Sequence, residues 1–198
     1  AMKGNPWNVP RGFPGSHSLD LLHQSLDVFL KTGILRSPTF DKSLRDGKGD
    51  RSGWCELKSK ILILEGWFVG CEPVSDLNNI DSLSEDKFNL SLSQDEKDYR
   101  SLIQESLIKY SKIWKKFDKI WHLKSSHFNN TILWKTQQEE EMIKIRGSGL
   151  KGNNLTDFIR MIQSSIPQQS LSFINADTTV QINQHRRIDK LLTTNYHF

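Results

Sequence analysis

Charged side chains and glycines alternate in several short stretches of this chain, a combination typical of loops that bind small anions. The first stretch, Arg11-Gly-Phe-Pro-Gly-Ser-His17, lies just before a predicted helix. An arginine side chain and the backbone N–H groups at a helix start together form a site for a carboxylate or a phosphate. A tight turn followed by an ordinary helix N-cap would use the same residue types, so both interpretations stay open.

The second stretch reads DKS and then, a few residues later, GKGDR. Its cations and glycine amides can approach a small anion closely. Arg51 is suited to bidentate binding of such an anion, and Asp41 or Asp50 is suited to accepting a proton from a hydroxyl group. A solvated loop is the alternative interpretation. The candidate residues of this stretch are Asp41, Lys42, Ser43, Asp50 and Arg51.

The third stretch is KILILE, residues 60–65, followed by Gly66. A short apolar run closed by a carboxylate is typical of a buried parallel strand that ends at an active site. Glu65 would then be well placed to hold Mg²⁺. The alternative for Glu65 is a structural ion pair.

Basic residues on a predicted helix at 129–146 form a fourth candidate group. Together with Lys151 just beyond that helix, Lys135, Lys144 and Arg146 are expected to reach over phosphates as part of a lid. Most basic residues on such a helix only form a solvated face. The acidic run Glu139-Glu140-Glu141 is interpreted as an exposed face that pairs with Lys135 or Lys144 at i,i±4 spacing.

A phosphate-binding loop of the GxxxxGK[ST] type has no match in this sequence. That motif supplies the backbone cradle and the lysine that position phosphates in many kinases. The glycine clusters at 47–49 and 147–152 differ in spacing and lack the Lys-Ser/Thr pair.

Predicted strands and helices alternate along the chain, which favours an α/β layer fold. Apolar residues recur at helical spacing in 18–31, which Gly33 would end, and in 96–118. Residues 71–95 are rich in Ser, Asn and Asp, which predicts a flexible surface connection. The predicted elements are helices at 18–31, 96–118, 129–146 and 154–164, strands at 36–43, 60–65 and 119–124, and a final hairpin of TTVQIN and DKLLTT.

The composition indicates one soluble domain. The chain has 198 residues, 36% of them hydrophobic and 25% charged, which is enough for a real core. No apolar run approaches the roughly 20 residues that span a membrane, and no nucleic-acid motif accompanies the net charge of +4. Cys55 and Cys71 lack metal-site spacing, and we interpret them as reduced thiols of a cytoplasmic protein.

Taken together, these stretches resemble the D-glycerate kinases of the plant, fungal and cyanobacterial type. That family belongs to the P-loop kinases, near phosphoribulokinase, uridine kinase and pantothenate kinase. Its pattern RGxPGTHD, PRYDKS, GxGDR and LEGW appears here as RGFPGSH, PTFDKS, GKGDR and LILEGWFVG, in the same order. WKTQQEEE resembles the family's WRxQxE lid, so the likeness extends over nearly the whole chain.

The resemblance implies a P-loop NTPase-like three-layer fold with a mainly parallel sheet, incomplete at its N-terminus. It implies transfer of the γ-phosphate of ATP, with Mg²⁺, to a hydroxyl of D-glycerate. The domain would cover 1–198, with a lid-like region at 129–153, and its partner would be a small hydroxy acid rather than nucleic acid or a membrane. The implied site residues are Arg11, His17, Lys42, Ser43, Asp50 and Arg51 around substrate and phosphates, Glu65 at the Walker-B-like position, and Lys135 in place of a lid arginine.

Three departures from the family pattern affect substrate affinity and lid chemistry. Ser18 replaces an aspartate, Thr39-Phe40 replaces Arg-Tyr, and Lys135 lacks the planar fork of arginine. The family's P-loop strand also has no counterpart here, which would leave an exposed sheet edge prone to homo-oligomer formation. We therefore expect weak or absent ATP binding, and no phosphorylation of glycerate by this chain alone.

Two other functions remain open from the sequence. One is a P-loop kinase for another small molecule, such as a nucleoside or a sugar phosphate; uridine would need a flat pocket, whereas glycerate needs a carboxylate clamp. The other is a non-catalytic binding or assembly module that kept the fold and lost turnover.

Overall fold

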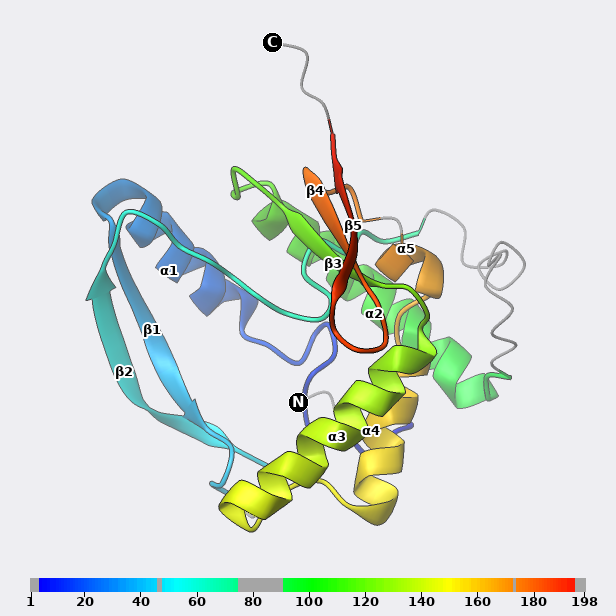
Figure 1. Ribbon diagram of the computed structural model, residues 1–198. Coiled ribbons are helices and arrows are strands. Elements are labelled where there is room, and N and C mark those ends of the chain that lie inside the picture. Colours follow the sequence, from blue (N-terminus) through cyan, green and yellow to red (C-terminus); the bar gives the residue numbers. More distant parts are fainter. Residues whose placement is uncertain (1–3, 46–47, 75–90, 173, 195–198) are drawn as a thin grey trace. The chain divides into compact units, whose positions relative to one another are not determined.

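The computed structural model describes residues 4–45, 48–74, 91–172 and 174–194. Its described residues form five helices and five strands, shown in Figure 1. The chain divides into two compact units. Among the described residues, unit 1 comprises 10–45 and 48–69, and unit 2 comprises 4–9, 70–74, 91–172 and 174–194. No helix among the described residues combines the length and the apolar character that crossing a bilayer requires.

Unit 1 begins with a glycine-rich loop and helix α1, Leu19–Thr32. This helix confirms the prediction at 18–31, and it ends where the sequence places a glycine. Gly33 adopts a left-handed conformation with φ 70°, and its N–H donates to the carbonyl of Phe29 at 2.7 Å. The glycine lacks a Cβ, so the chain reverses there at little steric cost and enters the next strand directly.

An antiparallel hairpin of two strands completes the regular structure of unit 1. Strand β1, Ile34–Asp41, confirms the strand predicted at 36–43, and β2, Asp50–Lys58, pairs with it. The ladder runs from Ile34 opposite Lys58 to Asp41 opposite Asp50, with a bulge between Thr39 and Phe40. The DKS and GKGDR motifs therefore lie across from each other at one end of the hairpin.

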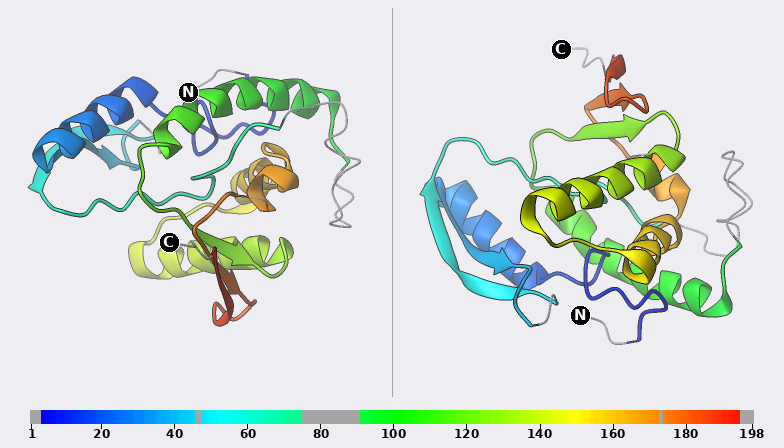
Figure 2. Two further views of the ribbon diagram at one scale, coloured as in Figure 1. Left: turned by 90° about the horizontal axis from the view of Figure 1, so that it is seen from above. Right: turned by 60° about the horizontal axis from the view of Figure 1, so that its bottom comes forward.

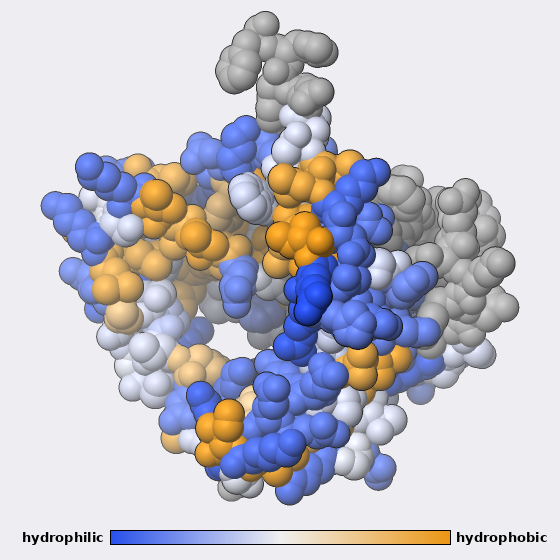
Figure 3. Space-filling view, viewed as in Figure 1, coloured by the Kyte–Doolittle hydropathy of each residue, from blue (hydrophilic) through white to orange (hydrophobic). Residues whose placement is uncertain are grey.

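The strand predicted at 60–65 is wrong for the described structure. Residues 60–66 form no ladder with any strand that the structure describes. A β-strand needs a neighbour for its backbone N–H and C=O groups, and this segment has none there. Its apolar side chains consequently reach the surface, with Ile61 75% and Ile63 84% exposed, and hydrophobic residues show along the segment after β2 in Figure 3.

Unit 2 is a mixed α/β layer. Its elements are α2 (Gln94–Trp114), β3 (Trp121–Ser125), α3 (Asn129–Arg146), α4 (Gly152–Ser164), α5 (Gln168–Ser172), β4 (Thr178–Ile182) and β5 (Ile188–Thr193). Strand β4 lies between β3 and β5, parallel to β3 and antiparallel to β5. Helices α3 and α4 lie side by side (Figure 2). These elements confirm the α/β class, the predicted helices at 96–118, 129–146 and 154–164, the strand near 119–124 and the final hairpin. Most of the connection predicted at 71–95 falls on residues 75–90, outside the described residues.

Helix α2 supplies the core of unit 2. Its buried apolar side chains are Tyr99, Ile103, Leu107, Tyr110, Ile113 and Trp114. The indole N–H of Trp114 donates to the carbonyl of Cys71 at 3.0 Å. Burial, helped by the charge of Glu72, raises the pKa of the Cys71 thiol to about 12, so this thiol stays protonated and inert at neutral pH.

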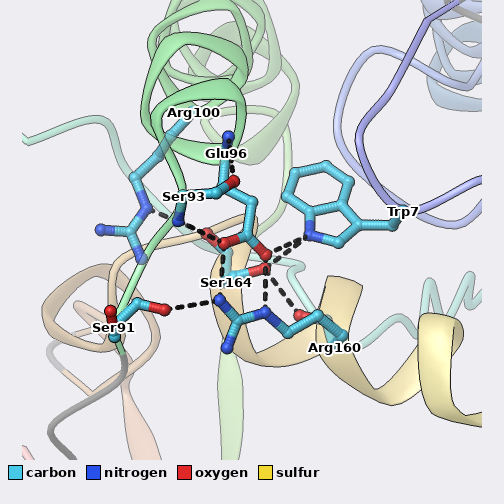
Figure 4. Close-up of polar contacts among 7 residues, drawn as sticks. All are labelled: Trp7, Ser91, Ser93, Glu96, Arg100, Arg160 and Ser164. Carbon is cyan, nitrogen blue, oxygen red and sulfur yellow. Dashed lines mark hydrogen bonds and ion pairs between the residues drawn. The ribbon is translucent and has the colours of Figure 1, made fainter.

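A buried carboxylate joins three parts of unit 2 (Figure 4). Glu96, in the first turn of α2, accepts hydrogen bonds from the indole of Trp7 at 3.0 Å and from Arg160 Nε of α4 at 2.6 Å. Arg160 Nη2 forms an ion pair with the same carboxylate at 2.5 Å. The segment 3–9, α2 and α4 are thereby fixed to one another through a single charged group.

The same carboxylate also begins helix α2. Ser93 and Glu96 form a capping box: the hydroxyl of Ser93 accepts from the Glu96 amide at 3.2 Å, and Glu96 Oε2 accepts from the Ser93 amide at 2.9 Å. Capping satisfies backbone donors that the first helical turn leaves unpaired. Burial raises the pKa of Glu96, but the hydrogen bonds from Arg160, Ser93 and Trp7 and the charge of Arg160 outweigh it and lower the pKa to about 2.

Candidate functional site

The loop RGFPGSH contacts the tip of the hairpin within unit 1. Arg11 donates a hydrogen bond from Nη1 to the carbonyl oxygen of Lys48. Its guanidinium carbon lies 5.3 Å from the centre of the Phe40 ring. Lys48 belongs to GKGDR, and Phe40 directly precedes DKS. Arg11 therefore links the loop RGFPGSH to both of these motifs.

The segment after Glu65 contacts the same loop from another direction. The indole N–H of Trp67 donates to the carbonyl of Gly12 at 2.6 Å, and the rings of His17 and Phe68 lie 5.6 Å apart. All four motif stretches of the N-terminal third therefore gather in unit 1. Desolvation lowers the pKa of His17, so its imidazole is neutral at pH 7.

The loop itself is a tight turn that depends on glycine. Gly12 and Gly15 have φ 108° and 92°, values that side chains with a Cβ rarely adopt. Ser16 Oγ accepts from the Gly12 amide at 3.0 Å and donates to the Phe13 carbonyl at 2.6 Å. Ser18 occupies the N-cap of α1 but makes no side-chain capping bond. The tight-turn interpretation is thus correct for the backbone, whereas the ordinary N-cap is not formed.

The two carboxylates of the hairpin end are cross-strand neighbours, each with its own donors. Asp41 Oδ1 accepts from the hydroxyl of Ser43 at 2.6 Å and from its amide at 2.8 Å, and these bonds lower the pKa of Asp41. Asp50 accepts from the Arg51 amide at 2.8 Å and forms an ion pair with Arg45 at 2.6 Å. Asp41 is therefore ionised at neutral pH and able to accept a hydrogen bond from a ligand hydroxyl.

The cations at the hairpin end are open to solvent. Lys42, Lys48 and Arg51 are exposed, whereas Arg11 is half-buried and its pKa is lowered by desolvation. Loss of water strengthens the interaction of a charged group with an incoming anion. Among these four cations, Arg11 therefore has the environment that most favours binding of an anion.

Glu65 is placed differently from its prediction. It is exposed, it does not end a strand, and within the described residues it has neither a hydrogen bond nor an ion pair. The alternative of a structural ion pair is therefore not realised there. No group of three or more His, Cys, Asp or Glu residues in the described part of the chain is arranged to hold a metal ion. Mg²⁺ commonly uses only one or two carboxylates together with phosphate oxygens and water, so a single carboxylate such as Glu65 fits that role.

The candidate lid residues lie on α3 of unit 2, and Lys135 is held by its neighbours there. Its ammonium group lies 2.5 Å from Glu139 Oε1 and 4.6 Å from the centre of the Phe158 ring on α4. The other oxygen of Glu139 accepts from the Leu150 amide at 2.8 Å. The i,i+4 pairing was predicted, but the exposed face was wrong for Glu139, whose side chain is only 5% exposed. Lys144 and Arg146 are exposed.

Several residues that join the motifs cannot be found as chemical candidates in the sequence. Phe40, Gly49 and Trp67 carry no charge, and Lys48 contributes through its backbone carbonyl. Their signal in the sequence is position only, since each lies within or directly beside a motif that was singled out for its charges.

Comparisons with known proteins agree with the resemblance of these motifs. No family model matches the chain. It is 26% identical over 195 residues to the uncharacterized kinase mug58 of Schizosaccharomyces pombe, covering 91% of this chain and 65% of that protein. It is also 26% identical over 190 residues to the probable ATP-dependent kinase TDA10 of Saccharomyces cerevisiae. This alignment covers 89% of this chain and 61% of that protein. The chain thus spans a little under two thirds of the length of these curated relatives.

Two solved structures share the fold. D-glycerate 3-kinase from Cryptococcus neoformans superposes with a TM-score of 0.81 at 24% identity, covering 96% of this chain and 71% of that one. The YGR205w protein superposes with a TM-score of 0.74 at 25% identity, and the superposition covers 99% of this chain and 71% of that one. The chain is therefore similar in sequence to two curated kinases and has the fold of these two solved structures.

Proposed function

We propose that this chain is part of an ATP-dependent kinase that phosphorylates a hydroxyl of D-glycerate, and that unit 1 binds the substrate. The observation that carries the proposal is that the loop RGFPGSH contacts both hairpin motifs through Arg11 and the segment after Glu65 through Gly12 and His17. The Cryptococcus D-glycerate 3-kinase with the same fold supports the choice of substrate, and the related yeast kinase supports ATP as the donor.

The charges of unit 1 suit a small hydroxy acid. Arg11 is proposed to bind the carboxylate, because a guanidinium matches the two oxygens of that group. Lys42, Ser43 and Arg51 would bind phosphate oxygens, and His17 would donate or accept a hydrogen bond. Asp41 and Asp50 would accept hydrogen bonds from the substrate hydroxyls, and either of them would take the proton that leaves the attacking hydroxyl.

The metal and the lid complete the proposal. When bound, Mg²⁺ would neutralise charge that develops on the transferred phosphate, and Glu65 would hold it. Residues 129–153 are proposed to act as a lid, with Lys144 and Arg146 facing phosphates and with Lys135 linked to Glu139. We further propose a single kinase-like domain and a cytoplasmic location.

The two alternative functions have less support. A nucleoside or sugar-phosphate kinase would share the fold, but neither curated kinase name nor the D-glycerate 3-kinase neighbour indicates such a substrate. A non-catalytic module would not need the ordered contacts among charged motifs that unit 1 preserves.

Calorimetric titration and an ADP-release assay test the proposal together. The purified chain is expected to bind D-glycerate but to release no ADP from ATP and Mg²⁺, because it carries no GxxxxGK[ST] motif to position phosphates. Uridine serves as the control ligand and should not bind. Binding of uridine without D-glycerate would favour the alternative kinase. Mg²⁺-dependent ADP release that Glu65→Gln abolishes would contradict the expected lack of turnover.

Self-association through the exposed apolar segment 60–66 remains a prediction of its own, although that segment is not the sheet edge expected from the sequence. Ile61 and Ile63 lie on a segment whose backbone has no ladder partner among the described residues, a situation that promotes pairing with another chain. Replacing both isoleucines with lysine is expected to shift a concentration-dependent oligomer to monomer in sedimentation velocity. Val28→Lys, at an exposed apolar position of α1, is the matched control. A wild-type chain that stays monomeric at every concentration would contradict this prediction.

A further inference from the structure

Phe40 contacts both the Arg11 guanidinium and the backbone of the hairpin tip. The guanidinium of Arg11 lies over its ring at 5.3 Å from the centre. The Phe40 ring also lies so close to the Gly49 backbone that a Cβ at Gly49 would be 2.6 Å from Phe40 Cζ. The same Cβ would lie 3.2 Å from Arg11 Nη1. Only glycine leaves room at this position for both the ring and the guanidinium.

The local backbone fixes both partners of Arg11. The register shift between Thr39 and Phe40 places Phe40 opposite Arg51 and leaves Ser52 as the extra residue on β2. Such a bulge increases the local twist of the hairpin beside Phe40. At the tip, the Gly49 amide donates to the carbonyl of Leu44 at 2.7 Å, and Gly49 has φ 75°. This turn holds the Lys48 carbonyl that accepts from Arg11.

We propose that Phe40 and Gly49 are positioning residues that set the plane of the Arg11 guanidinium for the anionic group of a ligand. A guanidinium binds a carboxylate or phosphate bidentately only when its plane faces the two oxygens. Stacking on an aromatic ring restricts that plane, and a hydrogen bond to a fixed carbonyl restricts rotation within it. The identity of the substrate rests on the proposed function, whereas the positioning of Arg11 does not.

The hairpin offers a matched control for this stacking. The guanidinium carbon of Arg36 lies 5.0 Å from the centre of the Trp54 ring, so the same type of contact occurs on the same two strands. Neither residue belongs to a charged motif. Removing the Trp54 ring therefore tests the effect of losing an exposed aromatic residue from the hairpin without touching Arg11.

The experiment compares wild type with Phe40→Leu, Phe40→Tyr and Trp54→Leu. Affinities for inorganic phosphate and for D-glycerate are measured by calorimetry, and the Arg11 Nε–Hε resonance is followed by NMR. Phe40→Leu is expected to weaken both affinities about threefold to fivefold, in line with a partly solvated stacking contact. It should also remove the ring-current shift of the Arg11 resonance. Phe40→Tyr should restore both properties, and Trp54→Leu should change neither.

Gly49→Ala supplies a second, independent variant. Its Cβ would displace the ring and the guanidinium, so anion affinity is expected to fall more than tenfold. When Gly49→Ala is combined with Phe40→Leu, the alanine should reduce anion affinity less, because the ring that its Cβ would meet is absent. Circular dichroism of each variant confirms that unit 1 remains folded before affinities are compared.

The outcomes separate the positioning of Arg11 from the proposed function. If phosphate binds with the expected variant pattern and D-glycerate does not bind, the substrate assignment fails and the positioning stands. If Phe40→Leu keeps wild-type affinity for phosphate, or keeps the Arg11 resonance in place, the positioning is overturned. It is also overturned if Trp54→Leu weakens phosphate binding as much as Phe40→Leu, or if the wild type binds neither anion.

Discussion

Replacing Glu96 with glutamine is expected to lower the free energy of unfolding of unit 2 by about 2–3 kcal/mol. The glutamine keeps the shape of the side chain but removes the charge that Arg160 and Trp7 share. Arg160 then loses its ion-pair partner while remaining about two thirds buried, with 33% of its side chain exposed. Removing one partner of a buried pair costs more than the pair contributes, because the remaining charge stays desolvated.

The effect of this substitution should depend on pH in a defined direction. The pKa of Glu96 is lowered to about 2 from an ordinary value of 4.5, so the folded state prefers the ionised form. The stabilisation is fully present above pH 4.5 and is lost as the pH falls toward 2. The difference in stability between wild type and Glu96→Gln should therefore be largest near neutral pH and shrink through that window.

Urea unfolding followed by tryptophan fluorescence at pH 7 and at pH 3 measures both effects. Glu140→Gln, at an exposed position of α3, is the matched control and should change stability by less than about 0.5 kcal/mol. Equal stability of Glu96→Gln and wild type at pH 7 would contradict the role of the buried carboxylate. A difference that grows on acidification would contradict the direction of the pKa shift.

Elements with strong local signals could be predicted from the sequence. Helix α3 occupies 129–146 as predicted, since Gly147 ends it in a left-handed conformation with φ 70°. Strand β2 was missed because its sequence holds a glycine, Gly53, and several charged residues, which are poor local signals for a strand. Its stability comes from the cross-strand ladder with β1, which no local pattern shows.

The segment 60–65 shows the opposite error. Its alternating isoleucine and leucine residues are a strong strand pattern, yet a strand exists only where a neighbour completes its hydrogen bonds. No described strand lies beside it. A local pattern therefore predicts the capacity to pair, while the pairing itself depends on the rest of the fold.

The candidate site was predictable in its charges but not in its connections. Arg11, Asp41 and Asp50 were found because charged residues beside glycines are conspicuous. The contacts that bring them together use a backbone carbonyl and an aromatic ring, which carry no such signal. The lid shows the same limit, because the spacing of Lys135 and Glu139 predicted their pairing but not the burial of Glu139.

Replacing Arg11 with alanine is expected to weaken D-glycerate binding about 30-fold, the largest effect on the proposed site. A hydrogen bond to a charged group contributes about 1.5–3 kcal/mol, and about 2 kcal/mol corresponds to this change in affinity. Arg11→Lys keeps the charge but loses the planar fork and the stacking on Phe40, so it should recover only part of the affinity.

The matched control is Arg36→Ala, which removes another arginine stacked on an aromatic ring of the same hairpin. Calorimetric titration of the three variants with D-glycerate should leave Arg36→Ala within about twofold of wild type. If Arg36→Ala and Arg11→Ala weaken binding equally, the general positive charge of unit 1 attracts the ligand, and no specific clamp exists. If only Arg11 matters and lysine does not replace it, the ligand is bound through the geometry of the guanidinium, which is the property that a carboxylate substrate requires.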